Sequence, residues 1–329
     1  MNAYRFNNAE TGLQLEHIDV PQASPGEVLI AVKAAGLCHS DCHILKGNDW
    51  IGKRPITLGH EVAGTIVALG DGVSNFRVGD RVAVALIAHP VEQMQLFAAI
   101  GLGFDGGFAE YVTAPVTHIV SIPDNVSYEQ AAIATDLIST AYHAILAEAN
   151  VTASTTVVVV GLGGLGLNGL QIAVLQGARV YGIDIDPKKC AAAKKLGAIE
   201  CFASLDSMKE MTIDVIVDFF GSSATLSKAI TTVKVGGRIV AVGLGEPETT
   251  LPLVSLVSRA IELKGSIGAS LEDLHSCLAL IASGDICPVL EYLPFTDLIE
   301  GYHRLERGEV NGRLFTRPGL SEKNTLTPA

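Results

Sequence analysis

A short segment of the chain, GLCHSDCHILKG, concentrates side chains that bind metal ions or carry protons. Positions 38–43 hold two cysteines, two histidines, a serine and an aspartate. On a helix, Cys38 and Cys42 would share one face and His39 and His43 the next, so these atoms cannot all point at one ion. A catalytic zinc ion takes three protein ligands and keeps one position open. The segment is therefore expected to form one part of a metal site that residues elsewhere complete.

The best partner for this segment is a histidine–glutamate pair 22 residues after Cys38. In ITLGHEVAGTI, His60 supplies an imidazole and Glu61 an adjacent carboxylate. A histidine beside a glutamate is unremarkable alone, since structural histidines outnumber metal ligands. Its combination with Cys38 and with a dinucleotide-binding pattern further along favours a metal site over a chance pairing.

A glycine-rich run in the second half of the chain predicts a dinucleotide site. The run GLGGLG follows the strand-like TVVVV and opens an apolar helix, which is the context that the GxGxxG pattern requires. Its glycines permit a tight turn and close approach to a pyrophosphate, and the helix N-terminus offers free N–H groups. The residues expected to contact cofactor are Gly161, Gly163, Gly164, Leu165 and Gly166. Two alternatives are a glycine turn without cofactor and, for the apolar stretch 156–175, a membrane span.

Asp184 follows 18 residues after Gly166, at the end of the next strand-like segment. A carboxylate there accepts hydrogen bonds from the adenosine ribose and repels a 2′-phosphate, so NAD is favoured over NADP. Position 185 is isoleucine rather than a basic residue, which agrees with that preference. The alternative is that Asp184 is merely exposed.

The strand and helix patterns divide the chain into two regions. Short β-like runs separated by Gly, Pro and Asp dominate the first ~135 residues, which indicates a mostly β domain. Strands then alternate with helices, as in a parallel sheet built from βαβ units. The expected strands are 156–160, 179–184, 201–204, 212–220, 237–243 and 261–267, with a helix at 187–198.

Composition and charge narrow the class of protein. With 329 residues the chain can form two domains, and 48% hydrophobic and 18% charged residues indicate a globular protein. The net charge of −12 argues against nucleic acid and anionic membranes as partners. Because no signal peptide and no CxxC pair is evident, we expect a cytoplasmic protein whose six cysteines are free thiols.

Several motifs in order resemble the zinc-dependent alcohol dehydrogenases of the medium-chain dehydrogenase/reductase family. They are GLCHSD, GHEVAGTI, VGDRV, GGFAEYV, DLISTAYHA, GLGGLG and the C-terminal GRLF. The resemblance implies an α/β fold with a Rossmann doubly wound parallel sheet and a mainly β GroES-like catalytic domain. It places the catalytic domain at 1–138 and 268–329 and the NAD-binding domain at 139–267.

The same resemblance implies roles for individual residues. The implied zinc ligands are Cys38, His60 and Asp136, with Glu61 as a carboxylate that can exchange onto the metal. The implied proton relay runs from the alcohol through Ser40 and the nicotinamide ribose to His43. The implied NAD contacts outside the glycine loop and Asp184 are His39, Thr140 and Arg313.

One stretch departs from the family pattern. After VGDRV many relatives carry four cysteines that hold a structural zinc, whereas ALIAHPVEQMQLFAAIGLGFDGG contains none. We therefore expect one catalytic and no structural zinc, and substrate preference cannot be inherited from relatives that keep this lobe. Trp50 and Leu86 are candidates for narrowing the substrate pocket, although Trp50 could equally serve packing.

The sequence thus predicts an NAD-dependent alcohol dehydrogenase whose small-molecule substrate is a primary or secondary alcohol or the corresponding carbonyl. The alternative enzyme is a biosynthetic medium-chain reductase acting on an activated C=C, C=N or aldehyde. A lyase or a non-enzymatic cofactor-binding protein are further options, but the second should have lost a ligand or relay residue, and all are present. The family resemblance implies a homodimer or homotetramer, with 245–263 as the candidate interface.

Overall fold

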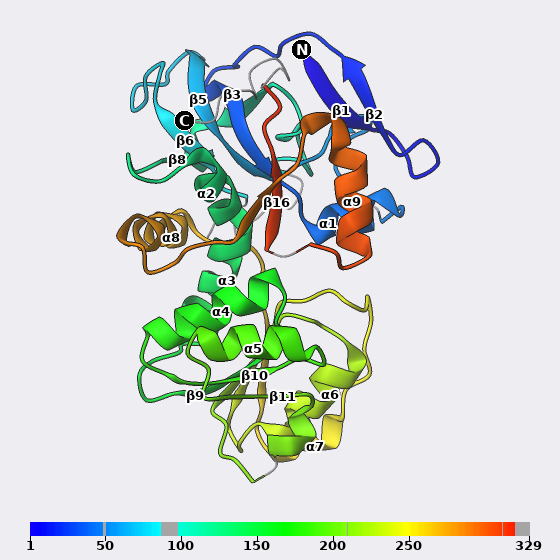
Figure 1. The fold of residues 1–329 in the computed structure, drawn as a ribbon, viewed down its shortest axis with the longest axis vertical. Helices are drawn as coiled ribbons and strands as arrows, with labels where there is room; N and C mark the ends of the chain where they lie inside the picture. Colours follow the sequence, from blue (N-terminus) through cyan, green and yellow to red (C-terminus); the bar gives the residue numbers. More distant parts are fainter. Residues whose placement is uncertain (49–50, 87–97, 209, 311, 320–329) are drawn as a thin grey trace. The chain divides into compact units, whose positions relative to one another are not determined.

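The computed structural model describes residues 1–48, 51–86, 98–208, 210–310 and 312–319. They form two compact units (Figure 1). The first comprises Met1–Asp136 with Ala269–Ala329, and the second is Leu137–Gly268. The first unit ends at 136 where the sequence predicts 138, and it resumes at 269 rather than 268.

The first unit is mainly β. Its larger sheet has the order β15-β16-β3-β5-β6-β8, with β7 paired to β3, and its smaller sheet has the order β2-β1-β4. The strands are β1 (Asn2–Phe6), β2 (Leu13–His17), β3 (Glu27–Gly36), β4 (Ile56–Thr57), β5 (Glu61–Leu69), β6 (Arg81–Val84), β7 (Tyr111–Pro115), β8 (Ile119–Ser121), β15 (Leu290–Tyr292) and β16 (Arg313–Thr316). The helices are α1 (His39–Leu45), η3 (Val116–His118), α2 (Tyr128–Ile133), α8 (Leu271–Ser283), η7 (Phe295–Asp297) and α9 (Leu298–Glu306).

Strand β3 is a central strand of the larger sheet and pairs with β5, β7 and β16. Its alternate residues Val28, Ile30 and Val32 are at most 1% exposed, as expected for a strand with one face in the core. It pairs antiparallel with β5 over eight residue pairs from Val28↔Leu69 to Gly36↔Glu61. This register places the end of β3 beside the start of β5, where the predicted metal-site motifs lie.

The second unit is a six-stranded, all-parallel sheet in the order β11-β10-β9-β12-β13-β14. Its strands are β9 (Thr156–Val160), β10 (Arg179–Ile183), β11 (Glu200–Phe202), β12 (Val215–Asp218), β13 (Arg238–Ala241) and β14 (Glu262–Gly265). Its helices are α3 (Ser139–His143), η5 (Ala144–Glu148), α4 (Gly164–Leu175), α5 (Pro187–Lys195), η6 (Leu205–Met208), α6 (Ser223–Thr232) and α7 (Leu253–Ser258), and η4 (Ala134–Ile138) precedes them. The prediction of two domains, one with a doubly wound parallel sheet and one mainly β, is confirmed.

The chain reverses direction across the sheet at β9. It runs outward through β10 and β11 and then returns to β12 on the other side of β9. Ligands of such sheets bind outside the carboxyl ends of the strands at this switch point. The glycine loop after β9 lies there.

The apolar stretch 156–175 is divided between strand β9 and helix α4. Among the described residues, no helix is long and apolar enough to cross a membrane. Helix α5 begins at Pro187 as predicted but ends at Lys195, because Gly197 takes the left-handed conformation at φ +105°.

The expectation that all six cysteines are free is wrong for one pair. Cys190 and Cys201 form a disulfide across 11 residues. The remaining thiols are free: Cys38, Cys42, Cys277 and Cys287. Neither motif spacing nor compartment marks this pair, because it is brought together by the packing of α5 on β11.

Candidate active site and coenzyme loop

The metal-binding region of the first unit lies where the end of β3 packs closely against the start of β5. Gly36, at the end of β3, lies opposite Glu61 at the start of β5. A Cβ atom on Gly36 would lie 1.8 Å from Oε2 of Glu61, so only glycine leaves space for that carboxylate. The chain then passes through Cys38, the N-cap residue of α1.

Three ligand atoms converge next to this turn. The Sγ of Cys38 lies 3.4 Å from Oδ2 of Asp136, and Nε2 of His60 lies 3.5 Å from the same oxygen. All three residues are buried, and their ligand atoms lie within 4.8 Å of one another. In the described part of the chain, no other group of three or more such side chains has this geometry.

Two further side chains orient His60. The Oδ1 atom of Asp41 lies 3.2 Å from Nδ1 of His60, as an ion-pair contact rather than an aligned hydrogen bond. The other oxygen of Asp41 accepts a hydrogen bond of 2.9 Å from the hydroxyl of Tyr302, in α9. Burial and the neighbouring Asp41 raise the pKa of Tyr302 well above its ordinary value, which keeps the hydroxyl protonated as the donor. His60 therefore presents Nε2 to the cluster.

The electrostatics of the cluster suit a cation. Burial lowers the pKa of His60, but the carboxylates of Asp41 and Asp136 outweigh it and raise the pKa well above its ordinary value. The two carboxylates thus favour a positive charge at Nε2 of His60, either a proton or a metal ion. Thiolate, imidazole and carboxylate are all zinc ligands, and three of them with an open fourth position match catalytic zinc. The residues fit the metal that the sequence predicts.

Glu61 and Arg313 form a buried ion pair at the edge of this cluster. The Nε atom of Arg313 donates to Oε2 of Glu61 at 3.0 Å, and its NH2 group donates to Oε1 of Glu61 and, at 3.3 Å, to Asp136. Burial raises the pKa of Glu61 to about 7, while Arg313 acts in the opposite direction. The predicted metal ligand Glu61 thus lies outside the group of three, held by Arg313. Arg313, which is predicted to contact NAD, here pairs with the carboxylates of Glu61 and Asp136. The role of Glu61 as a metal ligand and the role of Arg313 as an NAD contact stay predictions.

The predicted relay residues lie on α1. Ser40 is half-buried, and its Oγ lies 3.4 Å from Nε2 of His60, next to the ligand cluster. His43 is half-buried one turn further on. His39 is exposed, and its Nε2 lies 3.2 Å from the carbonyl oxygen of Leu305 at the end of α9. Cys42 faces the core, where burial raises the pKa of its thiol to about 12, so it remains a neutral apolar side chain.

In the second unit the glycine loop has the geometry of a phosphate-binding turn. Gly161 takes φ +81°, and a Cβ on Gly166 would lie 1.9 Å from the carbonyl oxygen of Gly161. Gly163 differs, because among the described residues other than its two chain neighbours no atom lies within 4 Å of the place that its Cβ would take. Gly164 and Leu165 then form the first turn of α4. The close packing of Gly166 on Gly161 sets the turn, and the open side of Gly163 leaves room for a ligand.

The side chain of Asp184 forms a hydrogen bond with this loop. Its Oδ2 accepts a hydrogen bond from the backbone N–H of Leu162 at 2.8 Å, and its Oδ1 accepts one from Asp186 at 2.9 Å. The carboxylate therefore lies beside the glycine loop at the carboxyl edge of the sheet. Thr140, also predicted to face the cofactor, is buried in α3.

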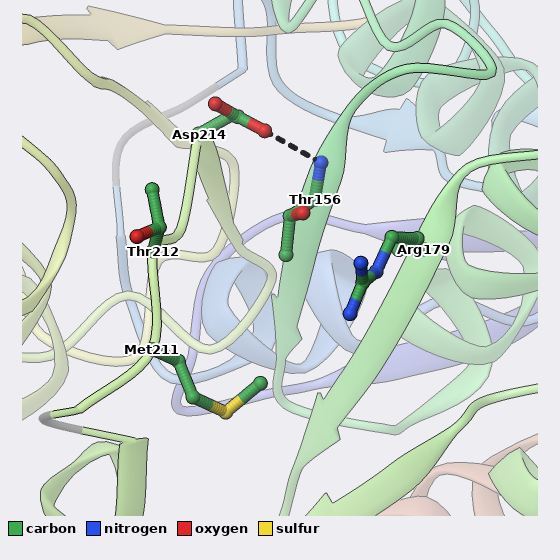
Figure 2. A pocket seen from close by; sticks show the side chains of 5 residues that line it. All are labelled: Thr156, Arg179, Met211, Thr212 and Asp214. Atoms are coloured by element: carbon green, nitrogen blue, oxygen red, sulfur yellow. Dashed lines mark hydrogen bonds between the residues drawn. The ribbon is translucent and has the colours of Figure 1, made fainter.

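A separate pocket of about 280 Å³ lies at the amino ends of the strands of this sheet, opposite the glycine loop (Figure 2). Thr156 and Arg179 line it from the amino ends of β9 and β10, and Asp214 from the residue before β12. Asp214 accepts a hydrogen bond from the N–H of Thr156 at 2.7 Å, drawn as the dashed line in Figure 2. Because the glycine loop follows the carboxyl ends, this pocket is not the coenzyme site.

The residues predicted to shape the substrate pocket are described only in part. Trp50 and residues 87–97 lie outside the described residues, while Leu86 is buried and packs against Ala99. Tyr302 was not predicted as a site residue. No motif marks it, since it reaches Asp41 across 261 positions of sequence.

Known proteins with the same features agree on the family. Residues 24–124 match the alcohol dehydrogenase GroES-like domain, and residues 164–283 match the zinc-binding dehydrogenase family. An alcohol dehydrogenase of Geobacillus stearothermophilus is 31% identical, over 95% of this chain and 98% of that protein. An acryloyl-coenzyme A reductase of Metallosphaera sedula is also 31% identical, over 95% and 99%. The solved structure of acetophenone reductase from Geotrichum candidum in complex with NAD has a TM-score of 0.88 and 31% identity, covering 97% of each chain.

The chain belongs to the zinc-binding alcohol dehydrogenase family of medium-chain dehydrogenases/reductases. The resemblance of its motifs to that family is confirmed, as is the pairing of GroES-like and Rossmann domains.

Proposed function

We propose that this protein is an NAD-dependent alcohol dehydrogenase that transfers a hydride between a primary or secondary alcohol and NAD, reversibly. The observation that carries the proposal is the buried cluster of Cys38, His60 and Asp136 in a chain of this family. A cofactor-binding protein without catalysis would have no need to keep three buried metal ligands together with Ser40 beside them.

Cys38, His60 and Asp136 would hold one catalytic zinc ion. When bound, zinc supplies Lewis acidity that lowers the pKa of an alcohol substrate. Asp41 and Tyr302 fix the His60 ring, and Arg313 holds Glu61 next to the cluster. No structural zinc is expected, because residues 85–107 contain no cysteine.

Ser40 would receive the alcohol proton. Its hydroxyl lies next to the ligand cluster and is half-buried, so a proton can pass from the interior toward solvent. His43, on the same helix, would carry the proton onward toward solvent. Removal of this proton would prepare the alcohol for loss of a hydride, and NAD, when bound, would supply the hydride acceptor.

The second unit would bind NAD. The loop from Gly161 to Gly166 would receive the pyrophosphate, and Asp184 would accept hydrogen bonds from the adenosine ribose. Its fixed negative charge disfavours the 2′-phosphate of NADP. Ile185 and Phe220, which are 88% and 55% exposed, follow the strands on either side of β9 and offer apolar surface for the adenine.

The runner-up is a reductase of the same family that acts on an activated C=C, C=N or aldehyde. The relative named acryloyl-coenzyme A reductase is as similar as the alcohol dehydrogenases, which supports this alternative. The presence of both Ser40 and His43 favours alcohol–carbonyl chemistry, since C=C reduction needs no proton removal from a hydroxyl. Oxidation of NADH by an α,β-unsaturated thioester, without NAD reduction by any alcohol, would favour the reductase.

We further propose that the protein is a homodimer or homotetramer that works in the cytoplasm, where NAD is available. Every residue of helix α7 is at least partly exposed, and its Leu253, Val254 and Val257 are 65–83% exposed. The neighbouring β14 is an edge strand of the six-stranded sheet. An apolar helix beside an open strand edge is what a second copy would cover.

The first experiment combines zinc analysis with an alcohol–NAD assay on the purified protein. We expect about one zinc per chain after dialysis, as catalytic sites of three ligands hold one ion, and NADH formation from simple alcohols. Cys38→Ala should lose both zinc and activity, whereas Cys42→Ala, the matched buried thiol four residues away, should keep zinc. Protein that binds NADH but holds no zinc would contradict the proposal.

A further inference from the structure

The disulfide between Cys190 and Cys201 ties a helix of the coenzyme-binding unit to its sheet. Cys190 lies in the first half of α5 and Cys201 in the edge strand β11, and their Cα atoms are 5.4 Å apart. This separation is ordinary for a disulfide and requires no movement of the backbone. Both cysteines are half-buried, so small oxidants and thiols in solution can reach them.

The disulfide lies beside the carboxylate proposed to bind the adenosine ribose. The Sγ of Cys190 lies 3.5 Å from the carbonyl oxygen of Asp184. The turn that connects the two is short: Asp186 caps α5 by accepting from Lys188 N–H, and it donates its own N–H to Asp184. A change at Cys190, six residues along the chain, therefore occurs in contact with the backbone of Asp184.

Cys201 reaches the glycine loop through Gly182. It pairs with Gly182 of β10, and a Cβ on Gly182 would lie 3.3 Å from Sγ of Cys201 and 3.0 Å from Leu162. Leu162 is also the residue whose N–H binds Asp184. Gly182 is thus close to both Cys201 and Leu162, and the N–H of Leu162 in turn binds the carboxylate of Asp184.

We propose that Cys190 and Cys201 are a reversible redox modification site that positions Asp184 for the cofactor. This inference rests on the proposed use of NAD. Oxidation removes two electrons and two protons from the pair of thiols and forms the S–S bond, while a peroxide oxidant takes them up and becomes two molecules of water. A dithiol reductant reverses the step and is itself oxidised to a disulfide.

The disulfide is expected to change cofactor affinity because it limits the conformations that the first turns of α5 can adopt. The disulfide restrains α5 against β11, and so restrains the Asp184 turn in the ligand-free protein. Without the bond, more conformations of that turn are available, and binding must select one of them. The zinc cluster is composed of residues from the other unit, so turnover at saturating NAD is not expected to change. Disulfides in reducing compartments are usually transient or redox-sensing, which agrees with a reversible site.

The test compares the whole protein after treatment with hydrogen peroxide and after reduction with a dithiol. Peptide mapping by mass spectrometry should find Cys190 linked to Cys201 after oxidation, and both alkylated after reduction. NADH titration by fluorescence should give a dissociation constant about 3- to 10-fold higher for the reduced form, while kcat stays the same. Hydrogen exchange over residues 184–196 should become faster on reduction.

Variants separate this pair from other thiols. The double variant C190S/C201S should bind NADH like the reduced protein in either treatment, and C287S, which removes an exposed free thiol, should respond as the natural chain does. If peptide mapping finds no link, or if exchange and NADH affinity are the same in both states, the proposal is overturned. If exchange responds but NADH binds in neither state, the redox link stands and the proposed NAD function is what fails.

Discussion

At the scale of single residues, the site depends on how buried charges are paired. Asp136 contacts Cys38, His60 and Arg313, so one carboxylate connects the other two residues of the cluster to the Glu61–Arg313 pair. A cysteine at position 136 would also be able to bind zinc. A carboxylate there can accept from Arg313, which a thiolate does only weakly.

Ser40→Ala tests the proton relay. We expect the variant to keep its zinc, because Ser40 is not one of the three ligands, and to lose about 10²- to 10⁴-fold in kcat for alcohol oxidation. Ser40→Thr, which keeps a hydroxyl, should recover part of that loss. Zinc content and alcohol-dependent NADH formation are measured on the same preparations. Full activity of the alanine variant would remove Ser40 from the relay.

At the scale of elements, the turn from β9 into α4 contains two glycines with different surroundings, Gly163 and Gly166. Gly166 packs against the Gly161 carbonyl, and Gly163 faces open space. The two glycines belong to one sequence pattern but have different neighbours. Substituting each by alanine should therefore have different effects.

Gly166→Ala should destabilise the protein, because its Cβ would lie 1.9 Å from a backbone oxygen. We expect a loss of about 2–3 kcal/mol in the free energy of unfolding, typical of forced overpacking. Gly163→Ala should cost under about 1 kcal/mol, because φ there is −76° and the residue is a helix N-cap. It should nevertheless weaken NADH binding by blocking the pyrophosphate. Denaturant unfolding and NADH titration distinguish the two, and equal stability of both variants would contradict this account.

At the scale of the whole molecule, the edges of the parallel sheet differ. At one edge α5 packs against β11, whereas next to β14, at the other edge, the apolar residues of α7 are exposed. An exposed apolar patch at an open strand edge is a typical surface for association between identical chains. Association there would bury the face that the single chain leaves uncovered.

Val257→Asp tests this interface. A charge at a position that is 70% exposed in the single chain should leave the fold intact but prevent association through α7. The control is Ile199→Asp, a residue 55% exposed next to β11 at the opposite edge. Size-exclusion chromatography with light scattering should give a smaller species for the first variant only. An unchanged mass for Val257→Asp would place the interface elsewhere.

Much of this molecule follows from local sequence. The run TVVVV, the glycine pattern and the proline that opens α5 specify strand, turn and helix through interactions within a few residues, so the coenzyme-binding unit was predictable in outline. Cys38 and His60 were identified because their motifs are short and specific. Element ends were less predictable. The expected strand 212–220 is only Val215–Asp218, and after it the backbone N–H groups of Phe220 and Gly221 bond to the Asp218 side chain instead of to a neighbouring strand.

Other features depend on contacts between distant parts of the chain. Tyr302 on Asp41, Arg313 on Glu61 and the disulfide of Cys190 with Cys201 carry no local signal, because each partner is chosen by packing. Hydrophobic periodicity specifies which face of a strand or helix is buried, but not which buried polar groups meet. The fold class and the residues of the buried Cys38–His60–Asp136 cluster therefore follow from the amino-acid sequence alone. The pairing of the buried charges and the disulfide next to the Asp184 turn arise only from tertiary packing.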